Sequence, residues 1–97
     1  MTSIKLNHNS LILSGSLNFQ NIKVLTEEAS KLLQTHLSIS EINLSYVKEV
    51  DSAALLLLLT LWRQAAKQKR PMQFINIPVE LKRLIGLSIL AKIIENS

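Results

Sequence analysis

A run of seven apolar residues, 53–59, limits the folds that are open to this chain. The surrounding segment, residues 52–68, contains no glycine or proline and is rich in helix-favouring residues, so it predicts one long helix. Even when it is extended to Trp62, the apolar run is only about half of the roughly 20 residues that a membrane-spanning helix needs. We therefore predict a buried helix of a soluble fold that does not span a membrane.

The same run is apolar on every side of the predicted helix, whereas a helix that covers a sheet needs only an apolar stripe. A domain of 97 residues has few other elements to cover the outer side. Two or three leucines left in water would form a patch of the kind that marks protein interfaces. We expect the first half of this helix to be partly a docking surface, and the same patch favours a homodimer of the isolated protein.

Alternating strand and helix patterns predict the architecture of a single domain, residues 1–97. Strands that alternate with helices favour parallel pairing through right-handed crossovers, with an opening hairpin at one edge. We predict an α/β fold with a small mixed sheet of about four strands and helices packed on it. The predicted strands are 4–7, 10–14, 39–44 and 72–77; the predicted helices are 21–36, 52–68 and 78–86; a polar connection is predicted at 45–51 and an apolar terminal element at 89–94.

The composition disfavours several classes of function. The absence of cysteine excludes disulfides and thiolate metal sites and favours a reducing, cytoplasmic location. Residues 1–5 show no signal-peptide pattern. His8 and His36 are not spaced as a metal pair, and the two glycines, Gly15 and Gly86, form no phosphate-binding loop. We therefore expect no enzyme activity, no metal and no cofactor.

The net charge is +4, and the excess of positive charge lies mostly between Leu61 and Arg83. Such a patch can attract nucleic acid, anionic lipid or an acidic protein surface, or it can be a solvated helix end whose cations complement the helix dipole. Aromatic residues make up only 4% of the chain, so we expect no base-stacking platform for nucleic acid. The cations of this segment are Arg63, Lys67, Lys69, Arg70, Lys82 and Arg83, against Glu80 alone.

The start of the long helix carries Asp51 and Ser52, whose side chains can accept hydrogen bonds from the first turn of a helix. With the preceding strand they form INLSYVKEVDSAAL, residues 42–55, which resembles the signature of STAS domains. In that family a strand ends in a turn of hydrophobic-Asp-Leu-Ser type, and a Val-Asp-Ser/Thr stretch opens the next helix. The segment LSGSL, residues 13–17, is similar to the family's early strand and its Gly-x-Leu exit.

Within the STAS family the chain looks closest to the MlaB type, the cytoplasmic subunits of ABC complexes that move phospholipids between inner and outer membranes. The resemblance implies a non-catalytic accessory subunit that binds an MlaF-like ATPase in a complex with an integral permease, at the cytoplasmic side of the inner membrane. An anti-sigma-factor antagonist, regulated by phosphorylation at Ser52, is the alternative. The implied partner-binding residues are Asp51, Ser52, Ala53, Leu55, Leu56 and Leu59.

Three positions depart from the family pattern. Ala53 and Ala54 stand where the family often has glycine shortly after the Ser/Thr position, and Asn43 stands where many members have aspartate. Glycine there lets a partner or kinase approach the backbone closely. These departures disfavour the phosphorylation alternative.

Overall fold

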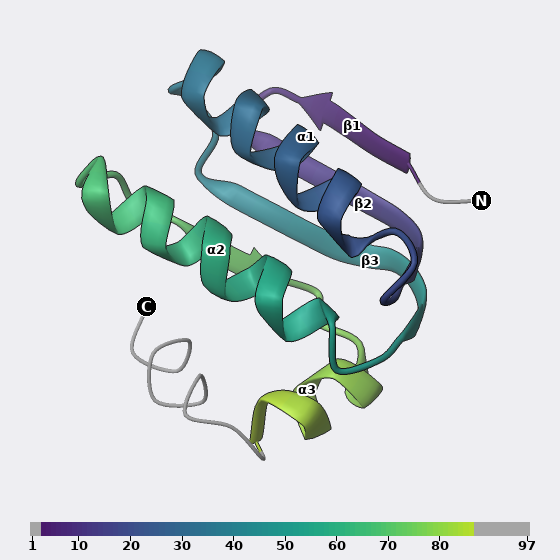
Figure 1. Cartoon of the computed structure of the whole chain (residues 1–97). Helices are drawn as coiled ribbons and strands as arrows, with labels where there is room; N and C mark the ends of the chain where they lie inside the picture. The colour runs from purple at the N-terminus through teal and green to yellow at the C-terminus, as the bar shows by residue number, and fades with distance from the viewer. Residues whose placement is uncertain (1–2, 87–97) are drawn as a thin grey trace.

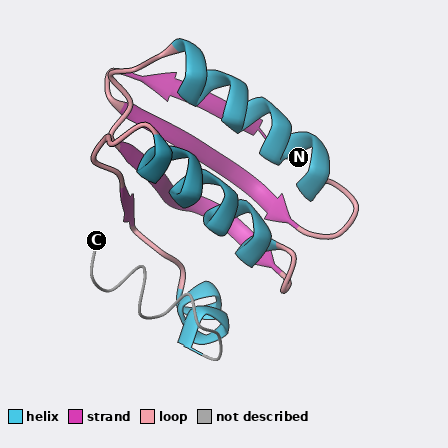
Figure 2. Cartoon of the chain, turned by 60° about the vertical axis from the view of Figure 1, so that its left-hand side comes forward, coloured by secondary structure: helices cyan, strands magenta, loops and turns pink. Residues whose placement is uncertain are grey.

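A four-stranded sheet and three helices make up residues 3–86, the part of the chain that this computed structural model describes (Figure 1). The elements are β1 Ser3–Asn7, β2 Ser10–Leu17, α1 Ile22–Thr35, β3 Glu41–Val50, α2 Ala54–Lys67, β4 Gln73–Ile75 and α3 Val79–Gly86. The strands lie in the order β1-β2-β3-β4, and α1 and α2 cover the same face of the sheet (Figures 1 and 2). The predicted α/β fold with a mixed sheet is confirmed.

Strand pairing follows the connections along the chain. β1 and β2 pair antiparallel through the turn His8-Asn9, in which His8 adopts a φ of 56°. β2 pairs in parallel with β3, and β3 with β4, because α1 and α2 carry the chain back along the sheet. The predicted hairpin at one edge and the predicted parallel pairing are both confirmed.

The core lies between the sheet and the two helices that cover it. Side chains from β2, β3, α1 and α2 are fully buried there, and burial of each leucine stabilises the fold by roughly 1.5–3 kcal/mol. They include Leu11, Leu13, Leu17, Leu33, Ile42, Leu44, Leu57, Leu58 and Leu61.

β3 is longer than the sequence predicts, and most of the polar connection expected at residues 45–51 is strand. The buried residues of β3 follow the two-residue period only as far as Leu44, and the next one is Val47. A shift in the register between β2 and β3 explains this spacing, because a bulge adds one residue to a strand. β2 likewise runs to Leu17, beyond its predicted end at Ser14.

The end of α2 fixes the position of Arg70. The N–H groups of Lys69 and Arg70 donate to the carbonyls of Ala66 and Ala65, each at 3.1 Å, and Lys69 adopts a φ of 52°. This is the hydrogen-bond pattern of a Schellman motif. The guanidinium of Arg70 then donates to three backbone carbonyls in the last turn of α1 and in the loop that leads to β3. They belong to Leu33 at 2.5 Å, His36 at 2.9 Å and Ile39 at 2.7 Å.

The described part of the chain ends with α3, in which Arg83 and Glu80 form an ion pair. Within residues 3–86, no helix combines the length and the apolar character needed to cross a membrane. The terminal element predicted at 89–94 lies outside the described residues.

Candidate docking site at the start of α2

The loops before α1 and α2 meet at the carboxyl end of the two central, parallel strands, β2 and β3. The N–H of Asp51 donates to the carbonyl of Leu17 at 3.1 Å, which holds the two strand ends together. In open α/β sheets, ligands commonly bind outside the carboxyl ends of the parallel strands. The predicted partner-binding residues Asp51 and Ser52 lie at this end of the sheet, directly after β3.

Asp51 joins the two loops through its carboxylate. Oδ1 accepts a hydrogen bond from the N–H of Ala53 at 2.8 Å, and Oδ2 accepts one from the N–H of Phe19 at 3.2 Å. One half-buried side chain therefore organises the turn before α2 and positions the loop before α1.

The start of α2 differs from the prediction. The helix begins at Ala54, with Ala53 at the cap position and no side-chain capping bond, so a cap of the helix itself by Asp51 or Ser52 is wrong. The N–H groups of residues 54–56 bond to carbonyls three residues back, as in a 3₁₀ turn. Asp51 caps this preceding turn instead, because the turn brings the N–H of Ala53 to its carboxylate.

Ser52 lies exposed in the turn before α2. Its hydroxyl makes no hydrogen bond to any of the described residues, so the fold does not use it for capping. The partial positive charge at the start of a helix favours an anion nearby. A phosphoryl group on Ser52 is therefore compatible with the fold.

Phe19 is a candidate contact residue that the sequence patterns did not reveal. It is 73% exposed, although the loop that carries it is fixed by Asn18 and Asn21. The N–H of Asn18 donates to Asn21 Oδ1 at 3.0 Å, and the N–H of Asn21 donates to Asn18 Oδ1 at 3.2 Å. A large apolar side chain held in water by a rigid loop indicates a contact residue. Its only signal in the sequence is an aromatic residue between Asn18 and Gln20.

Five consecutive leucines, residues 55–59, differ widely in exposure. Leu56 is 56% exposed, and the other four lie in the core or against it. Leu57 and Leu58 are fully buried, and Leu55 and Leu59 are half-buried. The expected patch of two or three exposed leucines is therefore wrong, since Leu56 alone of the five is exposed. The rest of the fold covers α2 on more than one side, so Leu55 and Leu59 also pack against the core.

Of the predicted contact residues, Ser52 and Leu56 reach the surface, while Asp51 is half-buried and holds the loops. Ala53 is only 7% exposed, and Leu55 and Leu59 pack against the core. We call the exposed residues Phe19, Ser52 and Leu56 the α2 docking surface.

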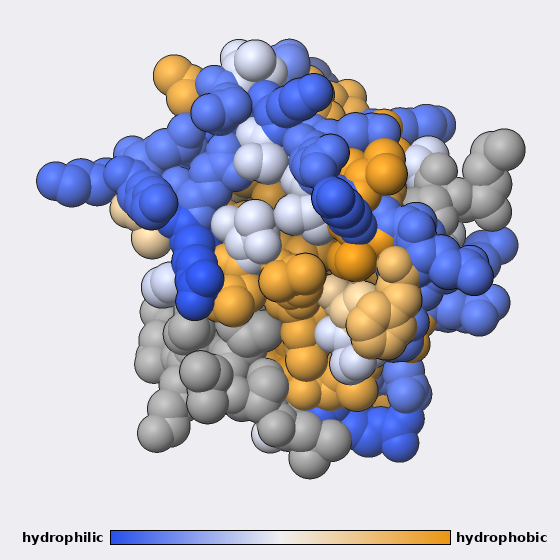
Figure 3. All heavy atoms as spheres, in the orientation of Figure 1, coloured by the Kyte–Doolittle hydropathy of each residue, from blue (hydrophilic) through white to orange (hydrophobic). Residues whose placement is uncertain are grey.

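A shallow groove runs between α1 and α2, and it begins at Leu56 of this surface. It consists of two adjoining hollows of about 640 and 470 Å³, which share Ser30 and Thr60 and which we call the α1–α2 groove. Leu56 lines the first hollow, and Lys67 lines the second. Figure 3 shows hydrophobic surface over the start of α2 and hydrophilic surface toward its other end.

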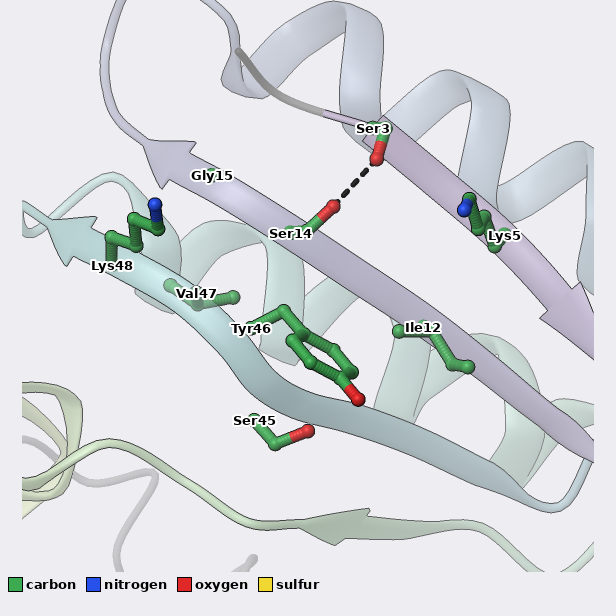
Figure 4. Close-up of a pocket in the computed structure, with 9 residues that line it drawn as sticks. All are labelled: Ser3, Lys5, Ile12, Ser14, Gly15, Ser45, Tyr46, Val47 and Lys48. Carbon is green, nitrogen blue, oxygen red and sulfur yellow. Dashed lines mark hydrogen bonds between the residues drawn. The ribbon is translucent and has the colours of Figure 1, made fainter.

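The opposite face of the sheet carries a separate hollow of about 610 Å³ (Figure 4). Lys5 and Lys48 lie toward its two ends, and Tyr46, which is 61% exposed, extends across the sheet between them. The hydroxyls of Ser3 and Ser14 are hydrogen-bonded at 2.5 Å. This face carries none of the predicted contact residues.

The charged side chains of the described residues fall into those bonded within the chain and those left exposed. Within residues 3–86, no three His, Cys, Asp or Glu side chains gather as metal ligands. Part of the basic segment has partners within the chain, because Arg70 binds backbone carbonyls and Arg83 pairs with Glu80 on the surface of α3. Arg63 and Lys67 remain exposed beside the α1–α2 groove.

Comparisons with known proteins add three findings. The family described as "Mlab, STAS domain" matches residues 1–95. The anti-sigma factor antagonist SpoIIAA in its unphosphorylated form is similar in structure, with a TM-score of 0.66 and 12% identity, over 91% of this chain and 84% of that chain. A proposed anti-sigma factor antagonist from Thermotoga maritima has a TM-score of 0.78 and 18% identity, over 96% and 82%. At these identities the two structures show a likeness of fold alone. Among curated proteins, none matches the sequence.

Proposed function

Because this chain belongs to the MlaB-type STAS domain family, we propose that it is a non-catalytic accessory subunit that binds the ATPase of a phospholipid-transport ABC complex. The match of the MlaB type over residues 1–95 favours this function over other functions of STAS domains. In this proposal the chain lies at the cytoplasmic side of the inner membrane, attached through the ATPase and its permease. It supports assembly and activity of the ATPase and so the maintenance of outer-membrane lipid asymmetry.

The observation that carries the proposal is the α2 docking surface, where two exposed apolar side chains and an exposed hydroxyl come from two loops that Asp51 ties together and from the start of α2. A few well-anchored apolar residues carry most of the binding energy of a typical interface. Asp51 and the Asn18–Asn21 loop fix the base before any partner binds. Little conformational freedom is then lost on docking, which favours affinity.

A subunit without catalytic groups can act on an ATPase by binding one of its states more tightly than the others. The differential affinity shifts the ATPase toward that state, which can be the assembled or the active one. For this role the chain needs only a stable α2 docking surface that is already formed before the ATPase binds.

The exposed hydroxyl of Ser52 favours a second candidate, an anti-sigma-factor antagonist regulated by phosphorylation at Ser52. A phosphate adds about two negative charges. In the proposed interface these charges would be covered by the partner together with Phe19 and Leu56, so the cost of desolvating them opposes docking. Phosphorylation then releases the partner under either function.

Co-purification from native membranes tests the proposal. The full chain is expressed with an affinity tag in its own host, the membranes are solubilised in mild detergent, and bound proteins are identified by mass spectrometry. We expect an ABC ATPase together with an integral permease, and loss of both with Leu56→Asp. Recovery of a soluble kinase instead supports the second candidate, and recovery of neither contradicts both.

A further inference from the structure

The α1–α2 groove differs in character between its two ends. Toward the starts of the helices, Ile22, Thr26 and Leu56 line a hollow whose surface is mostly apolar. Toward the ends of the helices, the lining is polar and includes Arg63 and Lys67. Leu56, Thr60, Arg63 and Lys67 are spaced four, three and four residues apart, so they lie on one face of α2.

Two hydrogen bonds fix the helices against each other near the middle of the groove. The hydroxyl of Ser30 donates to Gln64 Oε1 at 2.6 Å, and Gln64 Nε2 donates to the carbonyl of Ser30 at 2.9 Å. The groove therefore exists before a partner arrives, which limits the entropy lost on binding.

Four cations line the groove, and none of them has an ion-pair partner within residues 3–86. The ion pair in this part of the chain lies in α3, between Arg83 and Glu80. Glu27 is the single acidic residue among the groove's lining residues. The groove therefore presents an excess of positive charge that an acidic partner complements. The four cations are Lys23, Lys31, Arg63 and Lys67.

The charge and the shape of the groove discriminate between occupants. A second copy using the same face would oppose like charges, which disfavours self-association there. A lipid surface is flat, whereas the apolar part of this surface is a hollow between two helices. An amphipathic helix has the convex shape that fits such a groove, with its apolar face turned inward.

We propose that the α1–α2 groove binds an acidic amphipathic helix of the ATPase, with apolar side chains against Leu56 and acidic side chains against Arg63 and Lys67. This inference rests on the proposed function, since the helix belongs to the protein that docks on the α2 surface. Leu56 and Lys67 are separated by about three helical turns, or roughly 16 Å. A helix that lies along the groove therefore carries its apolar and acidic residues about three turns apart.

Photo-crosslinking in the native host locates the occupant. A photoreactive amino acid replaces Thr60, in the middle of the groove, or Tyr46, on the opposite face of the sheet as a control. The crosslinked peptides are identified by mass spectrometry. We expect the Thr60 probe to capture an ATPase segment with helical apolar spacing and several Asp or Glu residues, and the Tyr46 probe not to capture that segment.

Charge reversal tests the electrostatic part with matched variants of the full chain. Arg63→Glu with Lys67→Glu changes the groove, and Lys5→Glu with Lys48→Glu makes the same change of net charge on the opposite face. We expect the groove pair to weaken binding to the purified ATPase about tenfold or more at low salt, with a smaller loss at high salt. The control pair is expected to stay within about twofold.

Failure of this inference can be distinguished from failure of the proposed function. If an ABC ATPase is recovered but the Thr60 probe captures lipid, a second copy, a segment without acidic residues or nothing, the groove assignment is overturned and the proposed function stands. Equal losses from the two charge-reversed pairs also overturn it. If the captured acidic helix belongs to a protein that is not an ABC ATPase, the proposed function fails.

Discussion

Asp51 Oδ2 accepts a hydrogen bond of 3.2 Å from the backbone N–H of Phe19, 32 residues away in the chain. The other carboxylate oxygen accepts the N–H of Ala53 at 2.8 Å. Together these bonds tie the loop before α1 to the turn before α2, so that the exposed Phe19 keeps its position relative to Ser52. The α2 docking surface thus depends on a half-buried carboxylate that a partner need not touch.

We predict that Asp51→Ala lowers the free energy of unfolding by about 1–2 kcal/mol, because it leaves two backbone N–H groups without their acceptor. Urea denaturation followed by circular dichroism measures the change. Glu49→Ala, an exposed substitution two residues earlier, is the matched control and is expected to stay within about 0.5 kcal/mol. Equal stability of the two variants would show that the carboxylate does not hold the loops.

Arg70→Ala removes the donors of three backbone carbonyls at the junction of α1 and β3. We expect a loss of about 2–4 kcal/mol, because hydrogen bonds to charged groups are strong and those to Leu33 and Ile39 are partly buried. Arg70→Lys should recover only a minor part, since an ammonium group cannot span three acceptors as the guanidinium fork does. Arg63→Ala, in an exposed position of α2, is the control for loss of charge alone. A full rescue by lysine would contradict this account of the junction.

Lys69→Gly should make the protein more stable. Lys69 occupies the left-handed position after α2, with a φ of 52°, where a side chain costs about 1 kcal/mol relative to glycine. For a domain of this size a gain of about 1 kcal/mol raises Tm by about 4–8 °C. Thermal unfolding measures the shift, and a fall in Tm would mean that the lysine side chain makes a contact of its own.

Periodicity explains why most of the fold is predictable from the sequence. The apolar spacing of residues 22–33 fits one helix face, and the segment after Ser52 contains no helix breaker before Pro71. The sequence predicts a shorter β3, because the bulge separates the buried residues Leu44 and Val47 by three positions and so breaks the two-residue period. A bulge depends on pairing with another strand, which a local pattern does not contain.

Only the residues of the candidate site that lie in one continuous segment of the chain can be predicted from the sequence. Asp51 and Ser52 precede a long apolar helix, so the sequence alone marks them as candidate contact residues. Phe19 joins them through a hydrogen bond that spans 32 residues, and no local pattern predicts such a bond. The exposure of individual leucines in α2 cannot be predicted from the sequence either. A helix that is apolar on every side has no polar face to show which side is exposed to solvent.

Ser52→Glu should weaken docking while the protein stays folded. The side chain is exposed at the start of a helix, where a negative charge is favourable, so we expect the free energy of unfolding to change by no more than about 0.5 kcal/mol. Binding to the ATPase should fall about tenfold or more, since a charge is placed beside apolar contacts. Ser52→Ala is the matched control and should bind like the native chain. Unchanged binding of Ser52→Glu would move the interface away from this turn.

The affinity of the purified ATPase for Leu56→Asp tests the central claim most directly. Leu57→Asp serves as the neighbouring comparison: it buries a charge in the core and should cost about 4 kcal/mol or more. Leu56→Asp, measured by isothermal titration calorimetry with unfolding followed in parallel, should stay folded and lose about 2 kcal/mol of binding free energy, or about 30-fold in Kd. Native affinity in a folded Leu56→Asp variant would contradict the assignment of the start of α2 as the docking surface.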